Sequence, residues 1–248
     1  MAESTEKKVS TVEDFKNEVK KEAEYIVKDV FPKRTIELHN LLQSNKMNVE
    51  RLSKLKADLN IPIPDPSMFN SEDSEPQNKK RKIGDAPYEI TGTKVYSLPN
   101  GVSPCNKEVR EVIGLVKPYI IDLIDHANQI KMWITLSIPR IEDGNNFGVS
   151  IQEDTMAEAR QVETEAATYL DQLARYHITR GKIISKVAKY PHVEDYRQSV
   201  VELDEKEFIS LRLVVCELRN HYASLHDIII KNLDKIKKPR NSNADSLY

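Results

Sequence analysis

Cysteine is nearly absent from this 248-residue chain, which has only Cys105 and Cys216. No CxxC or histidine-spaced metal pattern surrounds either residue. A disulfide framework or a zinc site is therefore not expected, and reduced thiols suit the cytosol or the nucleus. Long apolar runs are missing as well. The first eight residues lack the apolar core of a signal peptide, and no later stretch reaches the roughly 18 apolar residues of a membrane span. We expect an intracellular protein without a metal, a cofactor or a membrane partner.

The chain also lacks an excess of charge of one sign. Its 37 basic and 39 acidic residues give a net charge of -2, without the basic surplus of a protein that coats nucleic acid. Nucleic acid is therefore not expected as a partner. Aromatic residues make up only 6% and charged residues 31%, a composition more typical of solvent-exposed helices than of β-sandwiches. The length allows one or two domains with a sizeable core.

Four segments carry apolar residues at helical spacing, and they are nearly free of glycine. In residues 10–42 the apolar positions are Val12, Phe15, Val19, Ala23, Ile26, Val30, Ile36, Leu38, Leu41 and Leu42. In the second segment, which should begin with Ser103 as N-cap and Pro104 as first helical residue, they are Val109, Ile113, Val116, Ile120, Leu123, Ala127, Ile130 and Ile134. In the third they are Met156, Ala159, Val162, Ala166, Tyr169, Leu173, Tyr176, Ile183 and Val187. In the last they are Phe208, Leu211, Val215, Leu218, Tyr222, Leu225, Ile229, Leu233 and Ile236.

These positions predict an all-α protein in which the apolar residues of the four segments form the core. Pro32 should kink the first helix near Phe31, Pro118 should bend the second, and Pro191 and Pro239 should end the last two. Spacings that alternate between three and four residues favour partners packed at a shallow angle. We therefore predict an elongated antiparallel four-helix bundle with two distinct ends.

The predicted organisation has four parts: an N-terminal helical region at 1–60, a linker at 61–102, a C-terminal helical region at 103–240 and a tail at 241–248. Residues 71–85 are polar and almost free of apolar side chains, so we expect a disordered linker. The linker contains the basic cluster Lys79, Lys80, Arg81 and Lys82. We interpret this cluster as a nuclear localisation signal, the alternative being a solvated charge run. The expected location is the nucleus, with some protein in the cytoplasm.

Residues 139–155, between the second and third helices, concentrate Pro, Gly, Asn and Asp and should form a loop. Ordered helix connections of this length more often bind or act than merely connect, although a plain solvent-exposed loop is the alternative. In an up-down bundle this loop and the tail lie at the same end, opposite the linker. The tail ends in Leu247 and Tyr248 after a polar spacer, which suits capture of a C-terminus in a pocket; a frayed end is the alternative.

No set of residues indicates catalysis. His221, Ser224, His226 and Asp227 are near neighbours on one helix and cannot converge as a nucleophile triad. The acidic run at 202–207 is better explained as a solvated helix face, and no glycine-rich phosphate loop occurs. We expect no catalytic residues, and an enzyme is the disfavoured interpretation.

Several strings resemble the 11S regulators (REG family) of the proteasome. They are residues 140–148, residues 191–197, Ile61-Pro62-Ile63-Pro64-Asp65-Pro66, the Phe31-Pro32-Lys33 kink, and residues 231–240 with a final tyrosine. The resemblance covers nearly the whole chain. The short linker with its basic cluster, Gly92-Thr93-Lys94-Val95 and the final seven residues resemble the gamma type of the family.

This resemblance implies a ring of seven identical bundles that docks on the α-subunit end ring of the proteasome core particle and opens its gate without ATP or ubiquitin. The substrates degraded would be peptides and unstructured proteins. The implied activation loop is Arg140, Ile141, Glu142, Asp143, Gly144, Asn145, Asn146, Phe147 and Gly148, with Asn145 most critical. The implied docking tail is Ser242, Asn243, Ala244, Asp245, Ser246, Leu247 and Tyr248. From their spacing, Lys182, Lys186 and Lys189 are candidates for lining the channel. The alternative function is a nuclear helical scaffold that oligomerises without activating the proteasome.

Overall fold

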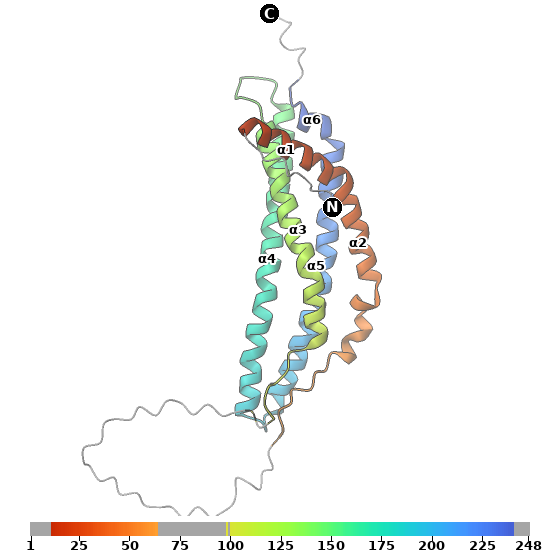
Figure 1. The fold of residues 1–248 in the computed structure, drawn as a ribbon, viewed down its shortest axis with the longest axis vertical. Helices are drawn as coiled ribbons and strands as arrows, with labels where there is room; N and C mark the ends of the chain where they lie inside the picture. The colour runs from red at the N-terminus through yellow and green to blue at the C-terminus, as the bar shows by residue number, and fades with distance from the viewer. Residues whose placement is uncertain (1–10, 64–97, 99, 241–248) are drawn as a thin grey trace, which may run out of the picture.

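Three long helices form the rod of the molecule in the computed structural model, which describes residues 11–63, 98 and 100–240. They are α3 (Lys107–Ser137), α4 (Phe147–Lys189) and α5 (Glu194–Lys231), and they run alternately up and down (Figure 1). The 43 residues of α4 correspond to a length of about 65 Å at the helical rise per residue. The basic cluster Lys79, Lys80, Arg81 and Lys82 and the tail residues 242–248 lie outside the described residues.

The fourth member of the bundle is the irregular helix that precedes the linker. It consists of α1 (Val12–Tyr25), the π-helix η1 (Ile26–Val30) and α2 (Phe31–Gln43). A capping box starts α1, in which the backbone N–H of Asp14 donates to Thr11 Oγ1 at 3.1 Å. The π-helix ends at Val30, two residues before Pro32, which has no N–H to donate to the preceding turn. The irregularity at residues 26–30 therefore lies next to Phe31, where Pro32 predicted a kink.

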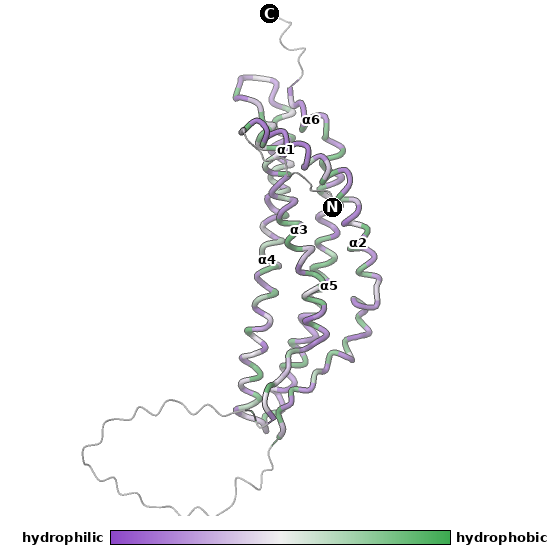
Figure 2. The backbone as a smooth tube through the Cα atoms, viewed as in Figure 1, coloured by the Kyte–Doolittle hydropathy of each residue, from purple (hydrophilic) through white to green (hydrophobic). Residues whose placement is uncertain are grey.

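The core follows the predicted apolar seams. All eight seam residues of α3, from Val109 to Ile134, are at most 9% exposed. The largest fully buried side chains are Trp133, Tyr222, Phe31 and Phe208. Figure 2 shows apolar and polar residues alternating along each helix, as in a bundle whose helices each keep a solvated face. Among the described residues, no helix is long and apolar enough to cross a membrane.

The predicted core was wrong at one surface. Val12, Phe15 and Ile36 are 72%, 43% and 59% exposed, because they point away from the rod on which Val19, Ala23 and Leu38 pack. The buried face of this segment therefore contains fewer of its apolar residues than the spacing predicted. Leu213 on α5, at 60% exposed, is likewise uncovered in the single chain.

The helix starts also differ from prediction. Helix α3 begins with Asn106 as N-cap, whose side-chain oxygen accepts from the backbone N–H of Val109 at 3.2 Å, and not at Ser103 and Pro104. Helix α3 continues through Pro118. Helix α4 begins at Phe147, so the connection spans 138–146, and residues 147–155 of the predicted loop are helical. The predicted end at Pro191 agrees with α4, which stops at Lys189. The last helix was predicted to continue to Pro239, but α5 ends at Lys231 and the separate short helix α6 (Leu233–Lys237) follows it.

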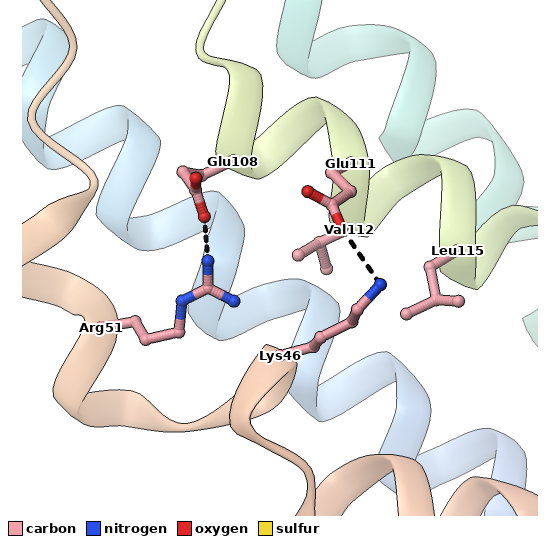
Figure 3. Close-up of a pocket in the computed structure, with 6 residues that line it drawn as sticks. All are labelled: Lys46, Arg51, Glu108, Glu111, Val112 and Leu115. Atoms are coloured by element: carbon pink, nitrogen blue, oxygen red, sulfur yellow. Dashed lines mark hydrogen bonds and ion pairs between the residues drawn. The ribbon is translucent and has the colours of Figure 1, made fainter.

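The end of the rod opposite the 138–146 loop is fastened by a small second core and by ion pairs. Leu59, Ile61, Val187 and Val200 form this core, with Leu98 packed against it. Nearby, the short helices η2 (Asn45–Met47) and η3 (Val49–Lys54) are joined to the start of α3 by ion pairs. Lys46 pairs with Glu111 at 3.0 Å, and Arg51 pairs with Glu108 (Figure 3). Both described flanks of the linker therefore lie at this end, as predicted.

Candidate functional site

The loop at 138–146 projects from the end of the rod that also carries the last described residues (Figure 1). Residues 140–147 are all exposed, and Ile141 at 101% and Phe147 at 72% present large apolar side chains. Gly144 and Asn145 have φ angles of +80° and +48°. Glycine and asparagine are the residues that adopt this left-handed backbone at least cost. The reversal of the loop is therefore encoded by these two residues.

Arg240 ties the two limbs of this loop together. Its Nη1 donates to the carbonyl oxygen of Arg140 at 3.0 Å and to Glu142 Oε2 at 2.9 Å. Its Nη2 donates to Asn146 Oδ1 at 3.1 Å. The Arg240 side chain is only 19% exposed, whereas that of Glu142 is 43% exposed. One guanidinium thus binds the outgoing limb and the residue that precedes α4, and we call these three bonds the Arg240 contact.

The loop carries further bonds of its own around Glu142. Its carboxylate also pairs with the guanidinium of Arg140, which is 88% exposed. The Asn146 amide donates to the Glu142 carbonyl oxygen at 3.4 Å, and the Asn146 carbonyl oxygen accepts from Ser150 at 2.9 Å in the first turn of α4. Glu142 and Asn146 therefore connect the loop both to α4 and to Arg240.

Beneath the loop, α4 packs directly on the C-terminal segment. The buried Gln152 donates through Nε2 to the carbonyl oxygens of Ser137 at 3.1 Å and Ile236 at 2.7 Å. Gly148 is buried, and a Cβ placed on it would lie 2.0 Å from the carbonyl oxygen of Pro239. A side chain at residue 148 would therefore displace the backbone at Pro239. Gln152 and Gly148 fix the base of the loop to the segment that leads to Arg240.

The short helix α6 (Leu233–Lys237) fastens this segment to the first helix. Lys237 Nζ lies 2.7 Å from Glu24 Oε2, and Lys28 lies 3.4 Å from the same oxygen. The hydrogen bond from Lys237 lowers the pKa of the Glu24 carboxyl group below its ordinary value, although partial burial opposes the shift. The Glu24 carboxylate therefore stays charged near neutral pH, and its contact with Lys237 holds α6 to the first helix.

The three candidate channel residues, Lys182, Lys186 and Lys189, are exposed on α4 near the opposite end of the rod. The ammonium group of Lys186 lies 5.5 Å from the centre of the Tyr196 ring, and that of Lys189 lies 5.2 Å from the Tyr190 ring. Such cation–π contacts orient the side chains without removing their charge. The structure therefore places these lysines far from the loop.

Two of the residues that were rejected as a nucleophile triad, His221 and Asp227, contact different partners. His221 lies 3.1 Å from Glu165 of α4, and Asp227 pairs with Lys231 one turn later on α5. No group of three or more potential metal ligands occurs within the part of the chain that the structure describes. The most buried charged groups are Arg180 and Asp204, 2.9 Å apart and 4% and 3% exposed, and they serve the second end of the rod.

Sequence patterns did not reveal the Arg240 contact. Arg240 was part of a string that resembled the family, but nothing in its spacing showed that it reaches back about 100 residues to the loop. Gln152 was also missed, because a polar residue in the first turns of a helix is ordinarily solvated. Only the antiparallel packing of α4 and the C-terminal segment brings these donors to their carbonyl oxygens.

The fold and this end define an all-helical rod in which an ordered loop and the C-terminal segment are joined. Family models for the N-terminal and C-terminal parts of the proteasome activator PA28 match residues 6–66 and 102–246. The chain is 53% identical to proteasome activator complex subunit 3 of Gallus gallus and 52% identical to that of Homo sapiens. Each alignment covers 96% of this chain and 94% of the relative. The chain therefore belongs to the PA28 family of proteasome activators, known also as the 11S regulators.

Solved structures agree with this family. The 11S subunit of the Plasmodium falciparum proteasome, PA28, superposes with a TM-score of 0.67 at 34% identity, covering 92% of both chains. A structure of the yeast 20S proteasome with the trypanosome activator PA26 matches at a TM-score of 0.55 and 11% identity, which supports the fold alone.

Proposed function

We propose that this protein binds the α-subunit end ring of the proteasome core particle and opens its gate, without ATP or ubiquitin. One observation carries the proposal: in a chain about half identical to proteasome activator complex subunit 3, the ordered loop and Arg240 are bonded together at one end of a rigid rod. A loop that contacts a gate must be both exposed and held in shape. Residues 140–147 are exposed, which meets the first need. The left-handed turn and the Arg240 contact hold the loop in shape, which meets the second.

In this mechanism the tail binds and the loop acts. Residues 242–248 anchor the protein on the core particle, and residues 140–148 contact the gate. A loop can shift a closed–open balance only through contacts that differ between the two states. Single tails of this size are weak anchors, but seven in one ring would bind together with high avidity. We propose the homoheptamer on the basis of family membership.

The remaining assignments belong to the same proposal. We assign residues 1–60 and 103–240 to the bundle, 61–102 to a linker with a nuclear localisation signal at 79–82, and 241–248 to the tail. The protein acts as a regulator and not as an enzyme, in the nucleus with some in the cytoplasm, and it favours peptides and unstructured proteins. Lys182, Lys186 and Lys189 line the channel, which their exposure at the end opposite the loop permits.

Hydrolysis of short fluorogenic peptides by latent core particle, with and without this protein and in the absence of ATP, tests the function. We expect a marked rise with the wild type. Asn145→Tyr should form the same ring and dock but give no rise, because a bulky side chain is strained at φ +48° and blocks the loop surface. Full stimulation by this variant would refute the loop assignment.

Asn145→Gly is the matched control, since glycine keeps the left-handed backbone and removes only the side chain. Activity in Asn145→Gly would assign the role of residue 145 to backbone shape, whereas its loss would assign that role to the amide group. No rise with the wild type, together with an intact ring by sedimentation, would instead support the scaffold alternative.

A further inference from the structure

We propose that Arg240 is a positioning residue that couples docking of the C-terminal tail to the conformation of the activation loop. The inference rests on the proposed function and adds a connection between its two parts. The tail and the loop are otherwise separate elements, far apart in sequence. Arg240 belongs to both, because it immediately precedes the tail and its guanidinium makes the Arg240 contact with the loop.

The geometry favours coupling over simple surface attachment. Arg240 bonds to the carbonyl oxygen of Arg140 on one limb of the loop and to Asn146 at the end of the other. Gly144 and Asn145, which reverse the chain, lie between these two attachment points. A guanidinium fixed in space therefore fixes the width of the loop on both sides of its turn. A planar fork of donors suits this task better than the single ammonium group of lysine.

The backbone next to Arg240 has little freedom to move independently of α4. Pro239 is buried against Gly148, and the Ile236 carbonyl oxygen is bound by Gln152. A force applied to the tail would consequently act first on Arg240, the described residue that directly precedes it. Coupling between binding and shape is reciprocal, so a loop seated on its target would also strengthen tail attachment.

Charge at this end supports a local role for Arg240. Lys238, two residues earlier, is exposed and has no described bond to the loop. Glu142, the acidic partner of Arg240, is shared with Arg140, so its carboxylate lies between two guanidinium groups of the same loop end. Removal of Arg240 leaves the Glu142 carboxylate with Arg140 alone and leaves the side-chain oxygen of Asn146 without its bond to Arg240.

The test compares Arg240→Ala with Lys238→Ala, which removes the same charge at the same end. Peptide hydrolysis by the core particle is measured over a range of activator concentrations, so that the half-maximal concentration and the maximal rate are separated. We expect Arg240→Ala to lower the maximal stimulation about five- to tenfold and to raise the half-maximal concentration by no more than about twofold, which is the smaller, reciprocal effect on tail attachment. Arg240→Lys should fall between, and Lys238→Ala should match the wild type.

Amide hydrogen exchange at Ser150, whose N–H donates to the carbonyl oxygen of Asn146 at 2.9 Å, provides a second readout in the free ring that needs no proteasome. We expect exchange about five- to tenfold faster in Arg240→Ala than in the wild type or Lys238→Ala. Glu142→Gln combined with Arg240→Ala should add little to Arg240→Ala alone, because Arg240→Ala has already removed the bond to the Glu142 carboxylate.

Three outcomes would overturn the coupling. They are unchanged exchange in Arg240→Ala, full maximal stimulation at saturating Arg240→Ala, and a loss confined to the half-maximal concentration, which would make Arg240 part of the tether. Failure of the proposed function is distinguishable, because in that case the wild type itself would give no stimulation. That result would also remove the role proposed for Arg240 in gating.

Discussion

At the scale of single residues, Gly148 lies closest to another backbone segment among the glycines that the structure describes. A Cβ there would meet three backbone atoms of Pro239, the nearest at 2.0 Å, so neither partner can give way by rotating a side chain. We expect Gly148→Ala to cost about 1–3 kcal/mol, as overpacking of a tight contact does. Thermal unfolding at one fixed protomer concentration measures the change, because assembly into the proposed ring would make the midpoint depend on concentration.

Gly114 supplies the control for this substitution. It is exposed within α3, and a Cβ at that position would have nothing within 4 Å. Gly114→Ala should therefore stabilise the protein by up to about 1 kcal/mol, since alanine loses less backbone entropy in a helix. Equal stability of the two variants would contradict the close packing of α4 on Pro239.

Glu207 on α5 is a second residue whose surroundings set a measurable property. Burial raises the pKa of its carboxyl group from 4.5 to about 7, and the nearby Lys206 only partly opposes the shift. The folded protein therefore binds more protons than the unfolded chain between these two pH values. Its stability contribution is favourable at acidic pH and is lost as pH rises from 4.5 toward about 7.

Glu207→Gln removes this titration and should be more stable than the wild type at about pH 8 but nearly equal at about pH 4, below the unfolded pKa. Unfolding midpoints at the two pH values give the difference directly. Glu153→Gln, at an exposed position of α4, controls for the loss of one negative charge. A gap of the same size at both pH values would show that Glu207 is solvated in the folded protein.

At the scale of elements, the end of the rod opposite the loop depends on a buried ion pair. Asp204 of α5 accepts from Arg180 at 2.9 Å, from Tyr176 at 2.8 Å and from Asn106, the N-cap of α3, at 2.7 Å. Arg180 also donates to the Pro104 carbonyl oxygen at 3.1 Å. Three helices and the segment that enters α3 therefore meet at one carboxylate.

We expect Arg180→Met to destabilise the protein by about 3–5 kcal/mol, because it leaves the Asp204 carboxylate buried without its cation. Asp171→Asn breaks the exposed Arg175–Asp171 pair and should change stability by less than about 0.5 kcal/mol. Thermal or denaturant unfolding compares the two. Similar small effects would mean that water reaches Asp204, whereas recovery in Arg180→Met with Asp204→Leu would confirm the cost of the unpaired charge.

The same elements show what periodicity can and cannot predict. The apolar seams predicted the helices and most of the core, because burial selects residues at every third or fourth position. The starts of α3 and α4 were misplaced because long-range contacts decide them. Asn106 caps α3 while its amide binds Asp204, and Gly148 enters the helix because Pro239 packs on it. A serine–proline pair and a glycine carry no information about such distant partners.

At the scale of the whole molecule, the up-down order of the helices predicted that the loop and the C-terminal segment share one end, and the Arg240 contact confirms this for the described residues. The exposure of Val12, Phe15 and Leu213 was not predictable. A seam shows which residues are apolar, but which of them one chain buries depends on the tilt of its helices. The assignment of the loop as an activation loop is likewise a proposal that comes from the resemblance and not from its turn residues.

Avidity belongs to the assembled particle and leads to the last prediction. If several weak tails bind together, each attachment after the first is intramolecular. Protein truncated after Asn241 should keep its size by sedimentation but lose binding to the core particle. Rings co-expressed from full-length and truncated protomers should bind less tightly with each missing tail, in steps that multiply and do not add. Native mass spectrometry gives the composition of each ring, and binding to immobilised core particle gives its affinity. An affinity that falls only in proportion to the fraction of full-length protomers would mean that each protomer binds alone, and the ring would then act by some means other than shared attachment.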